Sequence, residues 1–196
     1  MVSHLGDQQA KAPWRDYVAL LALIISIVAA IFTGYHAWVA RDTEKRLLRA
    51  YVLVSLNSPL EGFAPGQKLS VTAVLDNVGQ TPVYNATWIS GFNFLPYPLS
   101  SAIEWHYTCA ETMKLPTALH WFFGKQATAY RASESLLTGD EIARIKAGKD
   151  GIYLVGQICY RDIFQTVRET DFCMVWHWRG NELGNPDYCD TNNSGD

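Results

Sequence analysis

Histidine and cysteine are the side chains of this sequence best suited to metal or thiol chemistry. One close pair is present, His106-x-x-Cys109, and the others are scattered along the chain: His120, Cys159, Cys173, His177. Zinc sites usually combine a tight pair such as Cys-x-x-Cys with a second pair at a set distance. No second pair follows here. The sequence therefore predicts no metal site, and a metal-binding or thiol enzyme is the weakest of three functional hypotheses.

Other catalytic patterns are missing as well. A cysteine nucleophile needs a histidine partner, and none of the cysteines lies in a recognisable local signature. The segment 62–66 joins two predicted strands, whereas a phosphate-binding loop leads from a strand into a helix. The net charge of −3 provides no basic field for nucleic acid. We therefore expect a non-enzymatic protein that has no cofactor, no catalytic residues and no nucleic-acid partner.

The apolar stretch 17–40 is long enough to anchor the chain in a membrane, which would place any functional surface next to a bilayer. It carries no charged residue between Val18 and Thr33. About 20 apolar residues, each rising about 1.5 Å, are enough to cross a bilayer. Aromatic residues that favour the headgroup level flank the stretch at both ends: Trp14, Tyr17, Tyr35, Trp38. The sequence therefore predicts one transmembrane helix over 17–40, and the lipid bilayer is the first expected partner.

A cleaved signal peptide is the alternative for this stretch. The apolar core of a signal peptide spans about 7–15 residues and leads to a cleavage site of small residues. The run here is longer, and bulky Trp38 makes the segment 37–40 a poor cleavage site. The pattern therefore favours a retained membrane helix.

Lysine and arginine near the ends of the helix bear on its orientation. Lys11 and Arg15 precede it, and four basic residues follow it in a juxtamembrane helix predicted over 41–49: Arg41, Lys45, Arg46, Arg49. The positive-inside bias then favours a cytoplasmic C-terminal domain by a small margin and leaves a periplasmic one open. We interpret the four residues as a solvated helix end in preference to a specific lipid site.

The rest of the chain divides into tails and one domain. Residues 1–16 and the acidic segment 180–196 have little to bury and are predicted to be disordered. Residues 50–179 have the length of one domain. Their β-branched and aromatic runs predict strands over 50–56, 68–75, 83–94, 127–133, 151–162 and 170–179. A capping box at 138–141 predicts one short helix over 139–147. Residues 99–125 are the least readable: the residues 101–104 match a capping box that could open a second short helix, and the aromatic residues after them fit strands or core-filling loops equally well.

The last two strands form a predicted hairpin whose register can be proposed from the side chains. Pairing Tyr160 with Phe172 makes one face continuously apolar and sets Gly156 opposite an indole. The same register sets Cys159 opposite Cys173 on the other face. These two cysteines form the expected disulfide if the domain lies outside the cytoplasm, and they stay thiols in a reducing compartment.

The strands, the turn signals between them and the short helix predict a mainly β fold. The expected domain is an antiparallel immunoglobulin-like (Ig-like) β-sandwich, tethered by one N-terminal transmembrane α-helix. Four segments then carry a resemblance: 49–52, the Asn-Val-Gly-Gln-Thr-Pro-Val-Tyr-Asn run at 77–85, 153–162 and 170–173. In them the sequence resembles a loose group of uncharacterised bacterial single-pass membrane-anchored proteins. The resemblance implies a bacterial inner membrane and an Ig-like fold, and it lends no substrate, cofactor or partner.

Two non-enzymatic hypotheses remain. In the first, the domain is an interaction or accessory module that binds another membrane or soluble protein through exposed loops or a sheet edge. In the second, the protein is an accessory subunit whose helix packs into a larger membrane complex. Small residues give that helix a face for close packing: Ala22, Ser26, Ala29, Ala30, Gly34.

Overall fold

The computed structural model describes residues 14–104, 108–115 and 120–195. The chain forms two compact units, Met1–Arg46 and Leu47–Asp196. The predicted tail 1–16 lies mostly outside the described residues, as does His106 of the metal hypothesis.

The N-terminal unit consists of one long helix. Helix α1, Trp14–Leu48, contains the predicted apolar stretch and continues through the basic segment without a break. Its stretch Tyr17–Leu48 is long and apolar enough to cross a membrane, and none of its most apolar window is buried. Both membrane anchors and signal sequences have this character. The long N-terminal apolar helix is therefore confirmed, while its role in a membrane stays a prediction.

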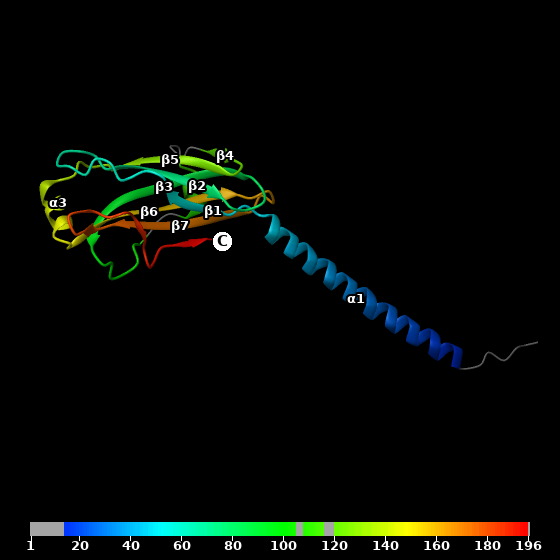
Figure 1. Ribbon diagram of the computed structural model, residues 1–196. Coiled ribbons are helices and arrows are strands. Elements are labelled where there is room, and N and C mark those ends of the chain that lie inside the picture. Colours follow the sequence, from blue (N-terminus) through cyan, green and yellow to red (C-terminus); the bar gives the residue numbers. More distant parts are fainter. Residues whose placement is uncertain (1–13, 105–107, 116–119, 196) are drawn as a thin grey trace, which may run out of the picture. The chain divides into compact units, whose positions relative to one another are not determined.

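The second unit contains antiparallel sheets (Figure 1). The smaller main sheet has the order β1-β2-β5, with β1 Val52–Leu56, β2 Ser70–Asn77 and β5 Gln126–Ala132. The larger one has the order β10-β7-β6-β3-β4, and β11 also pairs with β7. Its strands are β3 Val83–Pro96, β4 Trp121–Phe123, β6 Asp150–Arg161, β7 Val167–Trp176, β10 Asp187–Tyr188 and β11 Ser194–Gly195. A small hairpin joins β8, Trp178–Arg179, to β9, Glu182–Leu183.

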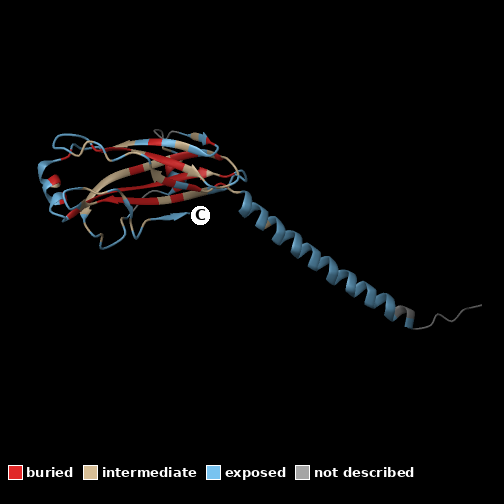
Figure 2. Cartoon of the chain, viewed as in Figure 1, coloured by how far each residue is buried: buried red, intermediate tan, exposed pale blue. Residues whose placement is uncertain are grey.

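The main core lies between the inner faces of these two sheets (Figure 2). Strand alternation turns every second side chain inward, so Val52 and Leu75 of one sheet share a cluster with Ile158 and Trp176 of the other. The opposite face of β6 and β7 has a second cluster built around Tyr153. Residues 95–103 and Cys189 cover that face. Because both faces of β6 are covered, its residues from Asp150 to Tyr160 are all buried.

The β6–β7 hairpin has the predicted faces and a different register. Tyr160 pairs with Arg168, and Phe172 pairs with Gly156, which is a shift of β7 by four residues from the proposed pairing. An even shift preserves which side chains face the core, so the apolar face was predicted correctly. Gly156 makes room for an aromatic ring as expected, but the ring is that of Phe172, which a Cβ at position 156 would overlap. The proposed pairing of Cys159 with Cys173 is therefore wrong.

The turn of this hairpin is tight, and it explains the shift. The Asp162 carboxylate accepts hydrogen bonds from the amides of Phe164 (2.9 Å) and Thr166 (3.0 Å), which closes the turn within five residues. Strand β7 therefore begins at Val167 and not at Thr170. A side chain that bonds to nearby amides in this way favours a turn over continued strand.

The helices were predicted in part. Helix α3, Gly139–Lys146, begins with the expected capping box of Thr138 and Glu141. The proposed capping box at 101–104 opens no helix, and α2, Cys109–Thr112, instead follows a capping box of Thr108 and Glu111.

The C-terminal segment is ordered, in contrast to the predicted disordered tail. We call residues 187–195 the C-terminal strap. The strap pairs with the outer edge of β7 at both of its ends, through β10 and β11. Side-chain amides hold the middle: Asn193 Oδ1 accepts from the amide of Cys173 (2.9 Å), and Asn192 exchanges two hydrogen bonds with the backbone of Ile103. Polar side chains thus replace the apolar burial on which the prediction depended.

Candidate functional site

A groove of about 610 Å³ opens between the outer edge of β1 and the C-terminal strap on β7. Its volume is typical of ligand-binding pockets. The lining is largely apolar, and hydroxyl, carboxylate and amide groups are set among the apolar walls. The lining residues include Tyr51, Val52, Leu53, Val54, Tyr160, Thr170, Asp171, Phe172, Tyr188, Asn193 and Ser194.

The floor of the groove is the free edge of β1. The backbone carbonyl of Tyr51 points toward the β2 side, where it accepts a hydrogen bond from Val78 N (2.8 Å). Because backbone groups alternate in direction along a strand, Val52 and Val54 turn theirs toward the groove. Their carbonyls accept from the hydroxyls of Thr170 (3.0 Å) and Tyr188 (2.9 Å). No described residue accepts from their two N–H groups, so this edge retains donors for an added chain.

Hydroxyl groups join the two sheets at this edge in place of a strand ladder. Besides Thr170 and Tyr188, the Tyr160 hydroxyl donates to the carbonyl of Ala50 (3.3 Å). Burial raises the pKa of Tyr160 above its ordinary value, so this hydroxyl remains a donor at neutral pH. The carbonyls of Ala50, Val52 and Val54 thus attach β1 and the residues before it to the larger sheet.

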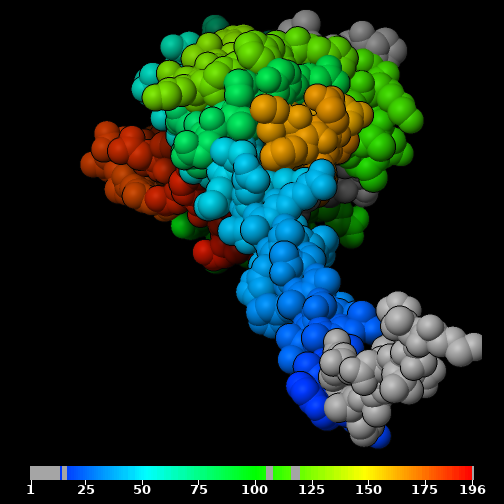
Figure 3. All heavy atoms as spheres, turned by 90° about the vertical axis from the view of Figure 1, so that its right-hand side faces the viewer, coloured from blue at the N-terminus to red at the C-terminus, as the bar shows by residue number. Residues whose placement is uncertain are grey.

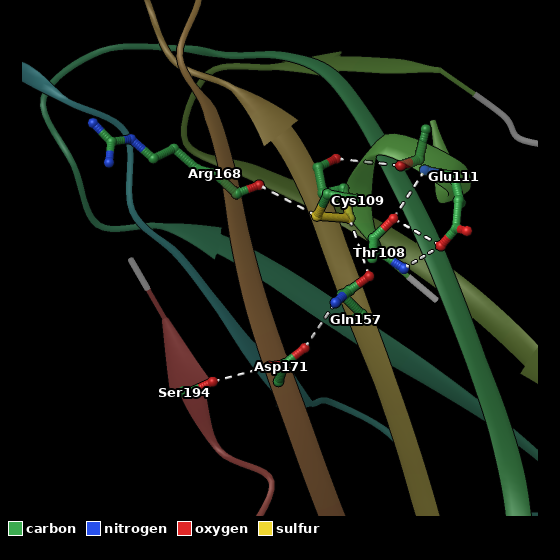
Figure 4. The surroundings of a disulfide bond; sticks show 9 residues. Thr108, Cys109, Glu111, Gln157, Arg168, Asp171 and Ser194 are labelled. Carbon is green, nitrogen blue, oxygen red and sulfur yellow. Dashed lines mark hydrogen bonds between the residues drawn. A yellow bond between two sulfur atoms is a disulfide. The ribbon is translucent and has the colours of Figure 1, made fainter. Parts of the chain in front are cut away.

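A polar wall faces the β1 edge across the groove. Asp171 accepts from Gln157 Nε2 (3.1 Å) and from Ser194 Oγ (2.9 Å), so its carboxylate links the centre of the sheet to the strap (Figure 4). Behind it lies the Cys109–Cys159 disulfide, whose Cys159 sulfur is 3.2 Å from Gln157 Oε1. The wall is therefore a connected polar row backed by a covalent bridge.

Both disulfides differ from the predicted one. Cys109 is bonded to Cys159, and Cys173 is bonded to Cys189, with separations of 50 and 16 residues along the chain. The first attaches α2 to β6, and the second attaches the strap to β7. All four cysteines are buried or half-buried. Sequence reasoning missed these pairs because both partners of the predicted bridge bond to residues outside the hairpin.

The disulfides also bear on the compartment. Such bonds persist in oxidising environments and are rare where thiols are kept reduced. Two of them suggest an extracytoplasmic domain, contrary to the expectation of a cytoplasmic one. That expectation depended on a difference of two charges at the helix ends, which is a weaker signal than covalent chemistry inside the fold.

The metal hypothesis receives no support from the described residues. Cys109, Cys159 and Cys173 are occupied by disulfides, and His120 is exposed. Within the described ranges, no group of three or more histidine, cysteine or acidic residues could hold a metal ion.

The predicted membrane residues all lie on α1 or directly after it. The aromatic residues expected at the headgroup level are exposed on α1: Trp14, Tyr17, Tyr35, Trp38. The basic residues Arg41, Lys45 and Arg46 are exposed as well, and Arg46 pairs with Asp42 at 2.9 Å. Arg49 follows the helix and lies over the ring of Tyr51, 4.2 Å from its centroid.

A second, smaller pocket of about 270 Å³ is lined in part by Tyr97 and Asp187, two residues that also contact His177. His177 stacks on Tyr97, with ring centroids 4.1 Å apart. Its Nε2 accepts a hydrogen bond from Arg179 Nε (2.9 Å), and its Nδ1 lies 3.8 Å from the carboxylate of Asp187. Arg179 also pairs with Asp187. Since Nε2 is an acceptor, this arrangement favours a neutral imidazole.

Acid is expected to destabilise the domain through His177. Burial and then the charge of Arg179 lower the pKa of His177, against the opposing effect of Asp187. The unfolded chain therefore takes up a proton first, and the free energy of unfolding falls as pH drops below about 6.5. Urea unfolding at pH 7.5 and 5.5 should show a smaller loss for His177→Phe, which keeps a ring against Tyr97. His120→Phe, at an exposed position, should retain the full loss; equal losses in all three proteins would contradict this assignment.

Comparison of the chain with protein-family models, curated proteins and solved structures finds no match. The groove, the two disulfides and the long apolar helix are therefore the features from which a function can be inferred.

Proposed function

We propose that this chain is a membrane-anchored, non-enzymatic interaction protein whose β domain binds an extended segment of a partner protein along β1. The helix α1 would hold the domain at a bilayer, and the groove would receive the partner. The partner is a protein of the membrane or of the space next to it.

The observation that carries this proposal is the β1 edge inside an apolar groove: its outward carbonyls are bonded to Thr170 and Tyr188, and its two outward N–H groups have no acceptor among the described residues. An added strand obtains affinity from main-chain hydrogen bonds and specificity from side-chain pockets. The N–H groups of Val52 and Val54 provide the first, and the surfaces of Leu53 and Phe172 provide the second. The opposite wall contributes the Asp171 carboxylate, which favours a basic or hydrogen-bond-donating side chain in the bound segment.

The strand order supports an Ig-like sandwich for the domain. In such folds the first, second and fifth main strands share one sheet and the third, sixth and seventh share the other, while the strand after the third joins either sheet in different subtypes. The observed orders β1-β2-β5 and β7-β6-β3-β4 agree with that arrangement. Ig-like domains commonly serve in recognition outside the cytoplasm, which is the compartment that the disulfides suggest.

The location that fits these features is a bacterial inner membrane crossed once, with the domain on the periplasmic side. In that orientation the basic residues from Arg41 to Arg49 lie outside the cytoplasm, against the positive-inside bias. Two disulfides that need an oxidising compartment outweigh a bias in charge counts.

Site-specific photo-crosslinking in intact cells tests the proposal. A photoreactive residue in place of Leu53, in the groove and 55 % exposed, should give a discrete adduct with one partner protein. The matched position is Leu136, which is also a leucine 55 % exposed and lies in the loop before α3. It should give no adduct of that mass. Identical adducts at both positions, or none at Leu53, would exclude β1 as the docking edge.

An accessory subunit of a larger membrane complex is the second candidate. The helix offers a small-residue face, on which the Ser26 hydroxyl is satisfied by the carbonyl of Ala22 (2.8 Å), and beyond the adjoining helix backbone no described atom lies within 4 Å of a Cβ placed on Gly34. A neighbouring helix could approach closely there. A photoreactive residue at Ala30 separates the two candidates, because only the accessory subunit gives its main adduct within the membrane.

A further inference from the structure

Three loops gather around the point where the chain enters the β domain. Asn77, at the β2–β3 turn, connects the entering segment with the β4–β5 turn: its Oδ1 accepts from Tyr51 N (3.2 Å) and its Nδ2 donates to the carbonyl of Gly124 (2.7 Å). The β2–β3 turn is packed so closely here that a Cβ on Gly79 would overlap the backbone of residues 49–51. The β6–β7 hairpin joins the group through Tyr160 and Ala50. Figure 3 shows this hairpin in orange beside the cyan segment through which the chain enters.

The tips of these loops carry exposed apolar side chains. Val78 on the β2–β3 turn is 59 % exposed, and Phe122, in strand β4 two residues before Gly124, is 65 % exposed. The β6–β7 turn adds Ile163, 46 % exposed, and Phe164, 38 % exposed. Single exposed apolar residues are ordinary on a protein surface, but a group at one end of a domain marks an interaction surface.

The β6–β7 turn holds its apolar pair in a fixed position. Asp162 is fully buried, and besides the two amides it accepts from Arg168 Nε (3.1 Å). The Arg161 guanidinium donates to the carbonyl of Gln165 (2.8 Å), which closes the other side of the turn. Ile163 therefore points outward from a structured turn.

Basic side chains surround the same loop tips, and acidic ones are few. Arg49, Lys125, Arg161 and Arg168 all belong to these loops or to the segment at residue 49. The carboxylate of Asp162 is buried against Arg168, and Asp76 bonds to Ser55 and Gln126. Apolar tips within a basic surround match the chemistry of an anionic lipid surface, in which acyl chains lie beneath phosphates.

Chain connectivity limits how far this end of the domain can lie from the predicted membrane span. Arg49 alone separates the last helical residue, Leu48, from the fully buried Ala50. Only the helical residues 41–48 lie between the predicted membrane span and the domain. At about 1.5 Å of rise each, they allow the span and the domain to be at most about 12 Å apart along the helix. The headgroup layer fills about 5–8 Å of such a distance.

We propose that this end of the β domain is a lipid-contacting surface for an anionic phospholipid bilayer. Val78, Phe122 and Ile163 enter the headgroup region, and Arg49, Lys125 and Arg161 meet lipid phosphates. The inference rests on the proposed membrane anchoring, and it adds a second attachment that would limit how the groove is presented to a partner.

Methyl NMR of the full chain in lipid nanodiscs tests this surface. The isoleucine methyl groups are labelled, and a lipid with a spin-labelled headgroup is included. The Ile163 signal should broaden severalfold more in anionic discs than in zwitterionic ones. Ile142 and Ile145, buried on α3, should stay sharp in both. Lys125→Gln combined with Arg161→Gln should remove the difference between the lipids, whereas Lys146→Gln combined with Lys149→Gln, with the same loss of charge near α3, should preserve it.

The outcomes separate this inference from the proposed function. A chain that incorporates into discs but keeps a sharp Ile163 signal in both lipids overturns the surface and leaves the anchor in place. A chain that stays outside the discs overturns both. Broadening that appears only when a second protein is added would assign the loop tips to a protein partner and overturn the lipid assignment.

Discussion

Removing the Cys109–Cys159 disulfide is expected to lower the free energy of unfolding by about 4 kcal/mol. The bond closes a stretch of 50 residues, which includes β4, β5 and α3, onto the central strand β6. In the chain-entropy model, a cross-link stabilises by restricting the unfolded chain, and its effect grows with the logarithm of the closed length. Cys109→Ala with Cys159→Ala is the appropriate variant, because both side chains are buried and alanine adds no unpaired polar group. Urea unfolding of the detergent-solubilised chain, followed by tryptophan fluorescence, measures the change.

The second disulfide is the matched comparison. Cys173 and Cys189 are 16 residues apart, so Cys173→Ala with Cys189→Ala should cost about 3 kcal/mol and should mainly release the strap. Together the two bridges are comparable with the whole stability of an ordinary domain, which is about 5–15 kcal/mol. A reduced domain in the cytoplasm would then be marginally folded. An equal or smaller cost for the 50-residue bridge would show that closed length does not govern its effect.

The faces of the β6–β7 hairpin could be read from the sequence, but its register could not. Alternation of Ile158, Tyr160, Phe172 and Met174 determines which side chains turn inward, and the structure has all four in the main core. Every even register satisfies that pattern equally. The choice among them is made by Asp162, whose bonds to two amides shorten the turn. That signal is a single aspartate, which is also compatible with an exposed loop.

The disulfide pairing was harder to predict from the sequence than the hairpin. Four cysteines allow three pairings, and the sequence favoured the one suggested by a local hairpin. The true partners, Cys109 and Cys189, lie in segments without apolar periodicity. Their paths depend on distant polar contacts, such as Asn192 with Ile103 and Asn193 with Cys173. Hydrogen bonds that single side chains make to residues far away in the sequence leave no repeating pattern that could reveal them.

The groove could not be predicted because it is made by those same segments. Its floor is β1, whose strand character was evident, and the opposite side is lined by the C-terminal strap, which was expected to be disordered. In contrast, the turn signal at 76–82 correctly separates β2 from β3, but neither Asn77 nor Gly79 has the positive φ that such residues tolerate. The structure uses Gly79 for its close approach to residues 49–51, and the side chain of Asn77 joins the entering segment, its own turn and the Gly124 turn.

Asn77→Asp is expected to lower the free energy of unfolding by about 3 kcal/mol. The amide of Asn77 uses its full bonding capacity. Oδ1 accepts from Tyr51 N (3.2 Å) and Gly79 N (3.0 Å), and Nδ2 donates to the carbonyls of Thr81 and Gly124, both at 2.7 Å. A carboxylate keeps the two accepted bonds but directs a second acceptor at two carbonyl oxygens. Each carbonyl then loses its donor, at a cost of about 1–3 kcal/mol when solvent does not replace it.

Asn77→Ala separates the two sources of that cost. Alanine leaves all four backbone groups without the side chain but introduces no charge, so a larger loss for aspartate than for alanine would identify repulsion between acceptors as the main cause. Asn57→Asp makes the same chemical change at an exposed position and should alter the urea midpoint little. Because Asn77 joins the loops to the segment entering from α1, its loss should also speed amide exchange at Tyr51 and Val78 before the core strands respond. A stability of Asn77→Asp equal to that of Asn57→Asp would mean that the packing of Gly79 alone holds these loops together.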